Sequence, residues 1–190
     1  HADDTDATGG GQTICYSAEN NSRISCSRSV ADSDIFVISA RHGSTIVSTD
    51  LDALGGGQIS SEDGSTVVLD NITLDTDTRA LSSVRGSTLL VYNSDITSSI
   101  ANDLMINCRD SSTVACDNCS LTLTGDSPYL SNCSASELSI IGCTVSYPNN
   151  AINGSGGCVV RVWGSSIPEA DVVSMANSAI TGRGILWGAV

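Results

Sequence analysis

Charged residues suited to acid–base chemistry recur directly before short Gly-Ser-Thr or Ser-Ser-Thr segments. They form two columns. One reads His42, Asp63, Arg85 and Asp110, and the other reads Arg41, Glu62, Val84 and Arg109, with Val84 as its one uncharged member. Asp63 or Glu62 beside His42 would supply the groups of a general acid–base site. The candidate catalytic residues of that hypothesis are His42, Glu62, Asp63, Arg85 and Asp110. Because the sign of the charge alternates along the columns, we favour a ladder of surface ion pairs, which stabilises little per pair.

Cysteine is the second residue type that could form bonds or act in a reaction, and the chain has eight cysteines in 190 residues. That number is typical of proteins from an oxidising compartment, where disulfides persist. The spacing predicts the pairs Cys119–Cys143, Cys108–Cys133 and Cys15–Cys26, and it leaves Cys116–Cys158 as the remainder. A redox role for the Cys116-Asp-Asn-Cys119 segment is disfavoured, because the segment crosses a predicted corner between strands.

No cofactor or metal is expected. The two histidines, His1 and His42, are far in sequence from every cysteine cluster, which disfavours zinc. A weaker alternative is a copper site formed by the amine and ring of His1, with His42 as the second histidine that such a site requires.

Five Asn-x-Ser/Thr sequons predict a secreted glycoprotein: Asn20, Asn71, Asn118, Asn132 and Asn153. The formal charge of −13 and the absence of lysine argue against a nucleic-acid partner. No apolar run approaches 18 residues, so no membrane insertion is expected. The chain begins at His1, as expected of a mature secreted form.

A repeat positions all of these residues. Its turn residues are 21, 22, 25, 24 and 22 positions apart, and they are Asp50, Asn71, Asn93, Asn118, Gly142 and Gly164. Asn, Asp and Gly tolerate the left-handed conformation that a sharp corner requires. Self-similarity at this period indicates coils stacked in a solenoid.

Apolar residues form columns when the coils are aligned on the turn. Four positions before the turn the column reads Ile46, Val67, Leu89, Val114, Leu138 and Val160, and twelve before it reads Ile38, Ile59, Leu81, Ile106, Leu130 and Ile152. Apolar positions two residues apart indicate strands with one buried face. We predict an all-β fold, a single-stranded parallel β-helix with three short strands per coil and about six to seven coils.

The three strands and the asparagine column resemble the right-handed parallel β-helix of the pectin-lyase-like superfamily over residues 36–167. The resemblance implies right-handed coiling and a polysaccharide lyase or glycoside hydrolase with carboxylates, or an Arg or Lys base, on the outside of one strand stack. The corresponding outward column reads Ser39, Ser60, Ser82, Asn107, Ser131 and Asn153. It has none of these groups, so we transfer no catalytic residue and lean away from an enzyme.

A second outward column reads Thr45, Thr66, Thr88 and Thr113, followed by Glu137 and Val159. Ranks of threonine on a flat face resemble those of ice-binding proteins. Threonine also has a high strand propensity, so a stabilising column is the preferred interpretation.

The sequence divides into an acidic, glycine-rich arm (1–12), a parallel β-helix domain (13–180) and an apolar tail (181–190). The leading hypothesis is a secreted, disulfide-bonded and glycosylated extracellular structural or surface protein that associates end to end into filaments. Tails that cap a monomer are the competing hypothesis. The alternative function is binding or cleavage of extracellular polysaccharide, so the expected partner is a second copy or a polysaccharide.

Overall fold

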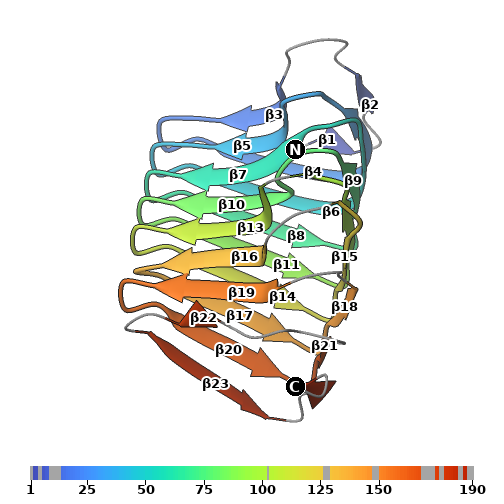
Figure 1. Cartoon of the computed structure of the whole chain (residues 1–190). Coiled ribbons are helices and arrows are strands. Elements are labelled where there is room, and N and C mark those ends of the chain that lie inside the picture. Colours follow the sequence, from blue (N-terminus) through green and yellow to red (C-terminus); the bar gives the residue numbers. More distant parts are fainter. Residues whose placement is uncertain are drawn as a thin grey trace.

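The computed structural model describes residues 2–3, 6–8, 14–101, 103–125, 129–146, 150–167, 174–175, 178–183 and 186–187. Over these residues the chain is an all-β parallel solenoid of about six turns, without a helix. Figure 1 shows the strands stacked coil upon coil along the rod. The predicted fold class is confirmed.

The first face of the rod is an eight-stranded sheet. Its strands are β3 (Ile14–Ala18), β5 (Phe36–Ala40), β7 (Gln58–Glu62), β10 (Leu81–Val84), β13 (Leu104–Arg109), β16 (Tyr129–Ser134), β19 (Asn150–Ser155) and β22 (Ser174–Met175). Neighbouring strands of this sheet pair in parallel, so each residue column runs along the rod.

A sixteen-stranded sheet bends around the other two faces. The second face comprises β1 (Ala2–Asp3), β4 (Arg23–Asp32), β6 (Thr45–Leu54), β8 (Thr66–Asp70), β11 (Thr88–Tyr92), β14 (Thr113–Asp117), β17 (Glu137–Ile141), β20 (Val159–Trp163) and β23 (Ala179–Arg183). The third face comprises β2 (Asp6–Thr8), the ends of β4 and β6, β9 (Thr73–Thr76), β12 (Asp95–Ser98), β15 (Ser120–Leu123), β18 (Thr144–Ser146), β21 (Ser166–Ile167) and β24 (Leu186–Trp187). Within the region predicted as an arm, β1 and β2 both stack on β4.

The corner between the second and third faces, called here the Asn corner, has one residue per coil in the left-handed region. These residues are Arg28, Asp50, Asn71, Asn93, Asn118, Gly142 and Gly164, with φ between 49° and 62°. The predicted turn column is confirmed, and Arg28 extends it by one coil. The side chains also join the coils, since Asn71 Nδ2 donates to Asp50 Oδ1 at 2.5 Å and Asn118 Nδ2 donates to Asn93 Oδ1 at 2.8 Å.

The corner between the first and second faces, called here the charged corner, usually has two consecutive left-handed residues. Such pairs are Asn20-Asn21, His42-Gly43, Asp63-Gly64, Arg85-Gly86, Asp110-Ser111 and Gly156-Gly157. The coil after β16 has a single left-handed residue here, Ala135. This shorter corner shifts the register, so Ile106 faces Ser131, not Leu130 as predicted. Asn132, not Ser131, therefore continues the outward column between Asn107 and Asn153.

Buried hydrogen-bonding side chains follow both of these corners. At the charged corner, the backbone N–H groups of Ser44, Ser87 and Ser112 donate to the hydroxyl of the serine in the next coil, at 3.1 to 3.3 Å. At the Asn corner, Ile72 N–H donates to Ser94 Oγ at 3.1 Å and Cys143 N–H donates to Ser165 Oγ at 3.0 Å. Both columns satisfy backbone groups that lie inside the rod.

The cysteines take part in this inner hydrogen bonding, and the structure holds all eight as thiols. The predicted partners Cys119 and Cys143, and likewise Cys108 and Cys133, contact each other through their side chains, so disulfides between them stay a prediction. Cys119 and Cys143 stand in the column of Ser94 and Ser165, and Cys119 N–H donates to Cys143 Sγ at 3.4 Å. Cys108 and Cys133 are direct neighbours in β13 and β16. Their thiols donate to the carbonyls of Ser112 and Ser136, at 3.5 and 3.4 Å.

The other two predicted pairs are wrong on geometric grounds. Cys116 lies in β14, and Cys158 precedes β20, with β17 between those strands. Two strand spacings are about 9.6 Å, beyond the reach of a disulfide. The Cys15 thiol donates to the carbonyl of Asp32 at the end of β4, whereas Cys26 lies near the start of that strand and donates to Val47.

Candidate functional site

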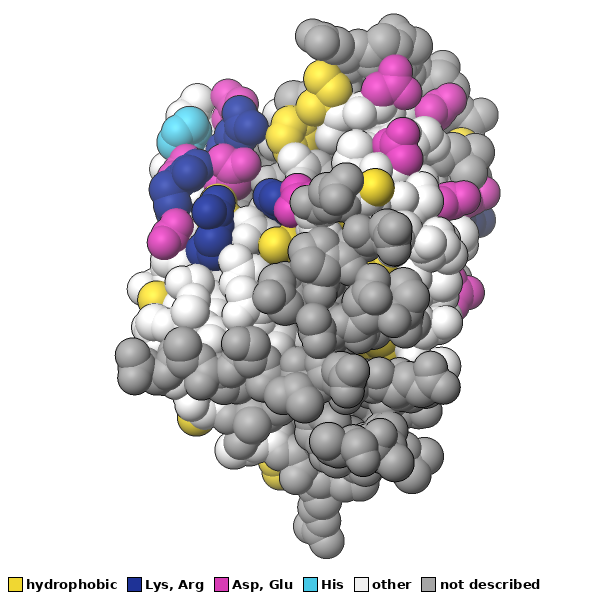
Figure 2. All heavy atoms as spheres, viewed as in Figure 1, with side chains coloured by type: hydrophobic (Ala, Val, Ile, Leu, Met, Phe, Trp, Pro, Cys, Tyr) yellow, Lys and Arg dark blue, Asp and Glu magenta, His cyan; other side chains and the backbone are white. Residues whose placement is uncertain are grey.

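The predicted charged columns meet at the charged corner, where Figure 2 shows basic, acidic and histidine side chains gathered over one edge of the rod. Arg85 pairs with both carboxylates of the coil before it, donating to Glu62 Oε2 at 2.6 Å and to both oxygens of Asp63. His42 Nε2 lies 3.6 Å from Asp63 Oδ2. Four of the five candidate catalytic residues therefore form one ion-pair cluster.

The electrostatics of this cluster favour a structural role. The Arg85 guanidinium, by its hydrogen bond, holds the pKa of the Asp63 carboxyl below its ordinary value. An acid that stays ionised at neutral pH cannot act as a general acid there. Asp110, the fifth candidate, is exposed, and its side chain makes no hydrogen bond or ion pair with the described residues.

The metal alternatives find no support in the described ranges. His1 lies outside the described residues, and no group of three or more His, Cys, Asp or Glu among the described residues could hold an ion. His42 is exposed and faces Asp63.

The predicted threonine column is in register on the second face, with Thr45, Thr66, Thr88 and Thr113 opposite one another. These side chains are half-buried, and an aliphatic column runs beside them. Ice binding by this face stays a prediction.

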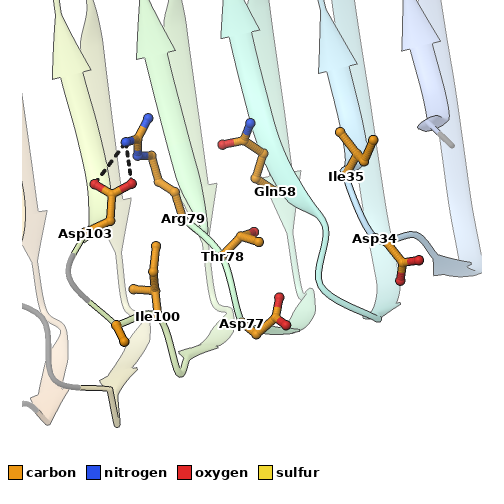
Figure 3. A pocket seen from close by; sticks show the side chains of 9 residues that line it. Asp34, Ile35, Gln58, Asp77, Thr78, Arg79, Ile100 and Asp103 are labelled. Atoms are coloured by element: carbon orange, nitrogen blue, oxygen red, sulfur yellow. Dashed lines mark hydrogen bonds and ion pairs between the residues drawn. The ribbon is translucent and has the colours of Figure 1, made fainter. Parts of the chain in front are cut away.

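A groove that sequence reasoning missed lies at the third corner, called here the loop corner, where residues 55–57, 77–80 and 99–103 join the third face to the first. Its cavity volume is about 490 Å³. It is lined by Asp34, Ile35, Gln58, Asp77, Thr78, Arg79, Ile100, Ala101 and Asp103. Figure 3 shows that these side chains come from successive coils, so the groove crosses several of them.

One ion pair closes part of the groove. Arg79 donates to Asp103 Oδ1 at 3.0 Å and to Oδ2 at 2.7 Å, and Leu104 N–H donates to Asp103 Oδ1 at 2.9 Å. The carboxylates of Asp34 and Asp77 are exposed and have no cationic partner among the described residues. The groove thus offers two open acceptor groups, a partly buried guanidinium and the apolar side chains of Ile35 and Ile100.

Threonine hydroxyls hold the loops of this corner in place. Thr76 and Thr78 both donate to the carbonyl of Gly56 in the preceding coil, at 2.9 and 2.5 Å, and Ser98 donates to the carbonyl of Thr78 at 2.8 Å. A second hollow of about 290 Å³, which contains Gly56, Thr76 and Ser99, adjoins the groove and shares Asp77 with it. The concave surface therefore spans several coils and is built on loops held by hydrogen bonds.

The groove left little signal in the sequence, because the loop-corner segments differ in length and fall into no column. Asp77-Thr78-Arg79 and the glycines at 55–57 were visible, but nothing aligned them with one another.

Comparisons with known proteins give no match: a scan of protein-family models finds none, and neither do searches of curated proteins and of solved structures. Among the described residues, no helix has the length and apolarity needed to span a membrane.

Proposed function

We propose that the protein is a secreted β-solenoid that binds an extracellular polysaccharide in the loop-corner groove. The observation behind this proposal is the open groove itself, which is lined by both hydrogen-bonding groups and apolar side chains from neighbouring coils. Sugar rings present hydroxyl groups at their edges and C–H groups on their faces, so they require this combination. Binding sites in general join a few placed polar groups to an apolar lining.

The charges of the groove narrow the class of polysaccharide. Asp34 and Asp77 have no cationic partner among the described residues, and the whole chain has a formal charge of −13. An acidic polymer would meet repulsion here, whereas neutral and amino-sugar polymers would not. Carboxylates accept hydrogen bonds from sugar hydroxyls and pair with ammonium groups.

The extent of the groove over several coils favours a polymer over a small sugar. The groove and the adjoining hollow share Asp77 and together extend across several coils. A chain of sugar units lying along the rod would contact side chains of several coils at once.

Cleavage of the polymer is not part of the proposal. The open carboxylates are exposed, and nothing around Asp34 or Asp77 sets one apart as an acid and the other as a base. We also propose that the protein belongs to the pectin-lyase-like superfamily and that its coils are right-handed. The parallel solenoid and the asparagine column support this proposal.

Affinity electrophoresis through gels that contain neutral, amino-sugar or acidic polysaccharide tests the function. We expect retardation by a neutral or amino-sugar polymer and weakening of binding by about tenfold in Asp77→Asn, the loss of one charged hydrogen bond. Asp95→Asn is the matched control, since Asp95 is an exposed carboxylate on β12 outside the groove. Free migration of the wild type in all gels, or equal retardation of Asp77→Asn, would refute the proposal.

A structural role by end-to-end association is the second candidate. It rests on the parallel strand order, which is the same in every coil and would let one rod continue the sheets of another. Light scattering at increasing concentration, with electron microscopy of the same sample, separates filaments from a monodisperse rod.

A further inference from the structure

The five sequons differ in their structural surroundings. Asn20 lies in a turn at the charged corner, Asn71 and Asn118 lie in the Asn corner, and Asn132 and Asn153 lie within β16 and β19. The folded protein can accommodate a glycan only where the side-chain amide projects from the surface without giving up a structural contact.

Asn20 meets that requirement. It is exposed and left-handed, with φ 56°, and it is followed by Asn21 with φ 62°. The turn is closed by Ser22 N–H, which donates to the carbonyl of Glu19 at 3.3 Å. The amide of Asn20 makes no hydrogen bond with the described residues, and Ser22, the third residue of its sequon, is exposed as well.

In the two sequons of the Asn corner, the asparagine side-chain amides already donate hydrogen bonds to the coil before them. Asn71 Nδ2 donates to Asp50 Oδ1, and Asn118 Nδ2 donates to Asn93 Oδ1. Each of these residues also stands directly between the side chains of the coils on either side, about 4.8 Å away. A sugar on either nitrogen would clash with the side chains of the neighbouring coils in this column.

The remaining two sequons lie in the sheet of the first face. Asn132 and Asn153 are direct neighbours in β16 and β19, and both are half-buried. A glycan on one would have to pass over the other and over the adjoining strand. Neither residue has the turn conformation of Asn20.

We infer that Asn20 is the N-glycosylation site of this protein and that the other four sequons are structural. The inference rests on the secreted setting of the proposed function, but not on the groove. In the modification, Asn20 Nδ2 forms a bond to C1 of an oligosaccharide carried on a polyprenyl diphosphate. The C1–O bond to the diphosphate breaks, the diphosphate leaves with the electron pair, and the amide proton passes to a base of the transferase.

The test is expression of the full chain behind a secretion signal in a eukaryotic cell, with glycopeptide mass spectrometry of the secreted and the intracellular protein. We expect a glycan on Asn20 alone. Ser22→Ala should remove the glycan while Asn20 stays in place, and Ser22→Thr should retain it, because threonine preserves the sequon. Both substitutions are at an exposed position, so the fold is expected to survive either one.

Two results would overturn the inference: an unmodified Asn20 in the wild-type protein, or a glycan on any of the other four sequons. Enzymatic removal of the glycan, followed by the same affinity electrophoresis, tests the glycosylation site separately from polysaccharide binding. Because Asn20 is at the charged corner and not in the groove, retardation should be unchanged. An unglycosylated protein that still binds polysaccharide would contradict only the inference, and a glycosylated one that binds none would contradict only the function.

Discussion

The sulfur of Cys143 accepts the backbone N–H of Cys119 at 3.4 Å and donates to the carbonyl of Ile141 at 3.2 Å. One coil later, Ser165 Oγ makes the same two bonds, accepting from Cys143 N–H at 3.0 Å and donating to Trp163 at 3.3 Å. A thiol and a hydroxyl thus fill the same place in one buried column. Cys143 therefore has the same hydrogen-bonding role in this column as Ser165 has one coil later.

Substitution of Cys143 tests this equivalence. Cys143→Ser should unfold with a free energy close to that of the wild type, because the hydroxyl supplies the same donor and acceptor. Cys143→Ala should lose about 1–3 kcal/mol, since the buried N–H of Cys119 is left without an acceptor. Urea denaturation of the three proteins measures both changes. Equal destabilisation by serine and alanine would show that the sulfur acts through packing alone.

At the Asn corner, a β-branched substitution should destabilise the fold more than a glycine substitution does. Asn93 has φ 49°, and its amide donates to Asp70 Oδ1 at 2.8 Å. Asn93→Val should destabilise the fold by about 1–2 kcal/mol from backbone strain, in addition to the lost hydrogen bonds. Asn93→Gly loses the same bonds without the strain, so it is the matched control. A valine variant as stable as the glycine variant would contradict the left-handed corner.

The charged corner predicts a contribution to stability that depends on pH. Because the hydrogen bond from Arg85 lowers the pKa of Asp63 in the folded state, the folded protein binds fewer protons there than the unfolded chain. The contribution is present above about pH 4 and is lost as the pH falls through the lowered value. Asp63→Asn should therefore be less stable than the wild type at pH 7, with a difference that shrinks towards pH 2.

Denaturation at several pH values measures this difference. Asp95→Asn on β12 is the control, because Asp95 has no ion pair with the described residues to lose. A gap between wild type and Asp63→Asn that stays constant from pH 7 to pH 2 would rule out the linkage.

The reactivity of the Cys116 thiol should be low in the native protein because the side chain is buried. Cys116 is fully buried, and that burial raises the pKa of its thiol, so little thiolate is present near pH 8. Iodoacetamide should leave Cys116 unmodified in the native protein and modify it fully in guanidinium chloride. Peptide mass spectrometry gives the extent of modification. Rapid labelling of native Cys116 would mean that this part of the rod opens readily.

The sequence predicted the repeating parts of the molecule well, because a repeat makes the same physical demand in every coil. Left-handed corners at Asn71 and Asn118 and the column from Ile46 to Val160 were both legible from residue type and spacing. The misplacement of Leu130 arose where one corner is a residue shorter, which constant spacing cannot detect. The pairs Cys15–Cys26 and Cys116–Cys158 were wrong because spacing along the chain does not give the distance between strands.

The groove was beyond prediction for a related reason. Its residues come from segments that no periodicity aligns, and only the fold brings Asp34, Asp77 and Asp103 to one surface. The ion pairs of Glu62 and Asp63 at the charged corner, by contrast, follow the repeat, and the alternation of charge predicted them. Asp110 was predicted to join them and makes no ion pair with the described residues.

The uneven length of the loop corner has a consequence for how the molecule can change. The Asn corner turns on one residue per coil and the charged corner on one or two, whereas the connections at 55–57, 77–80 and 99–103 grow by a residue from one coil to the next. Insertions and deletions can therefore accumulate at that one edge without disturbing the stacking of the remainder. Variants of this protein should therefore diverge most in the loop-corner groove and least in the stacked strands.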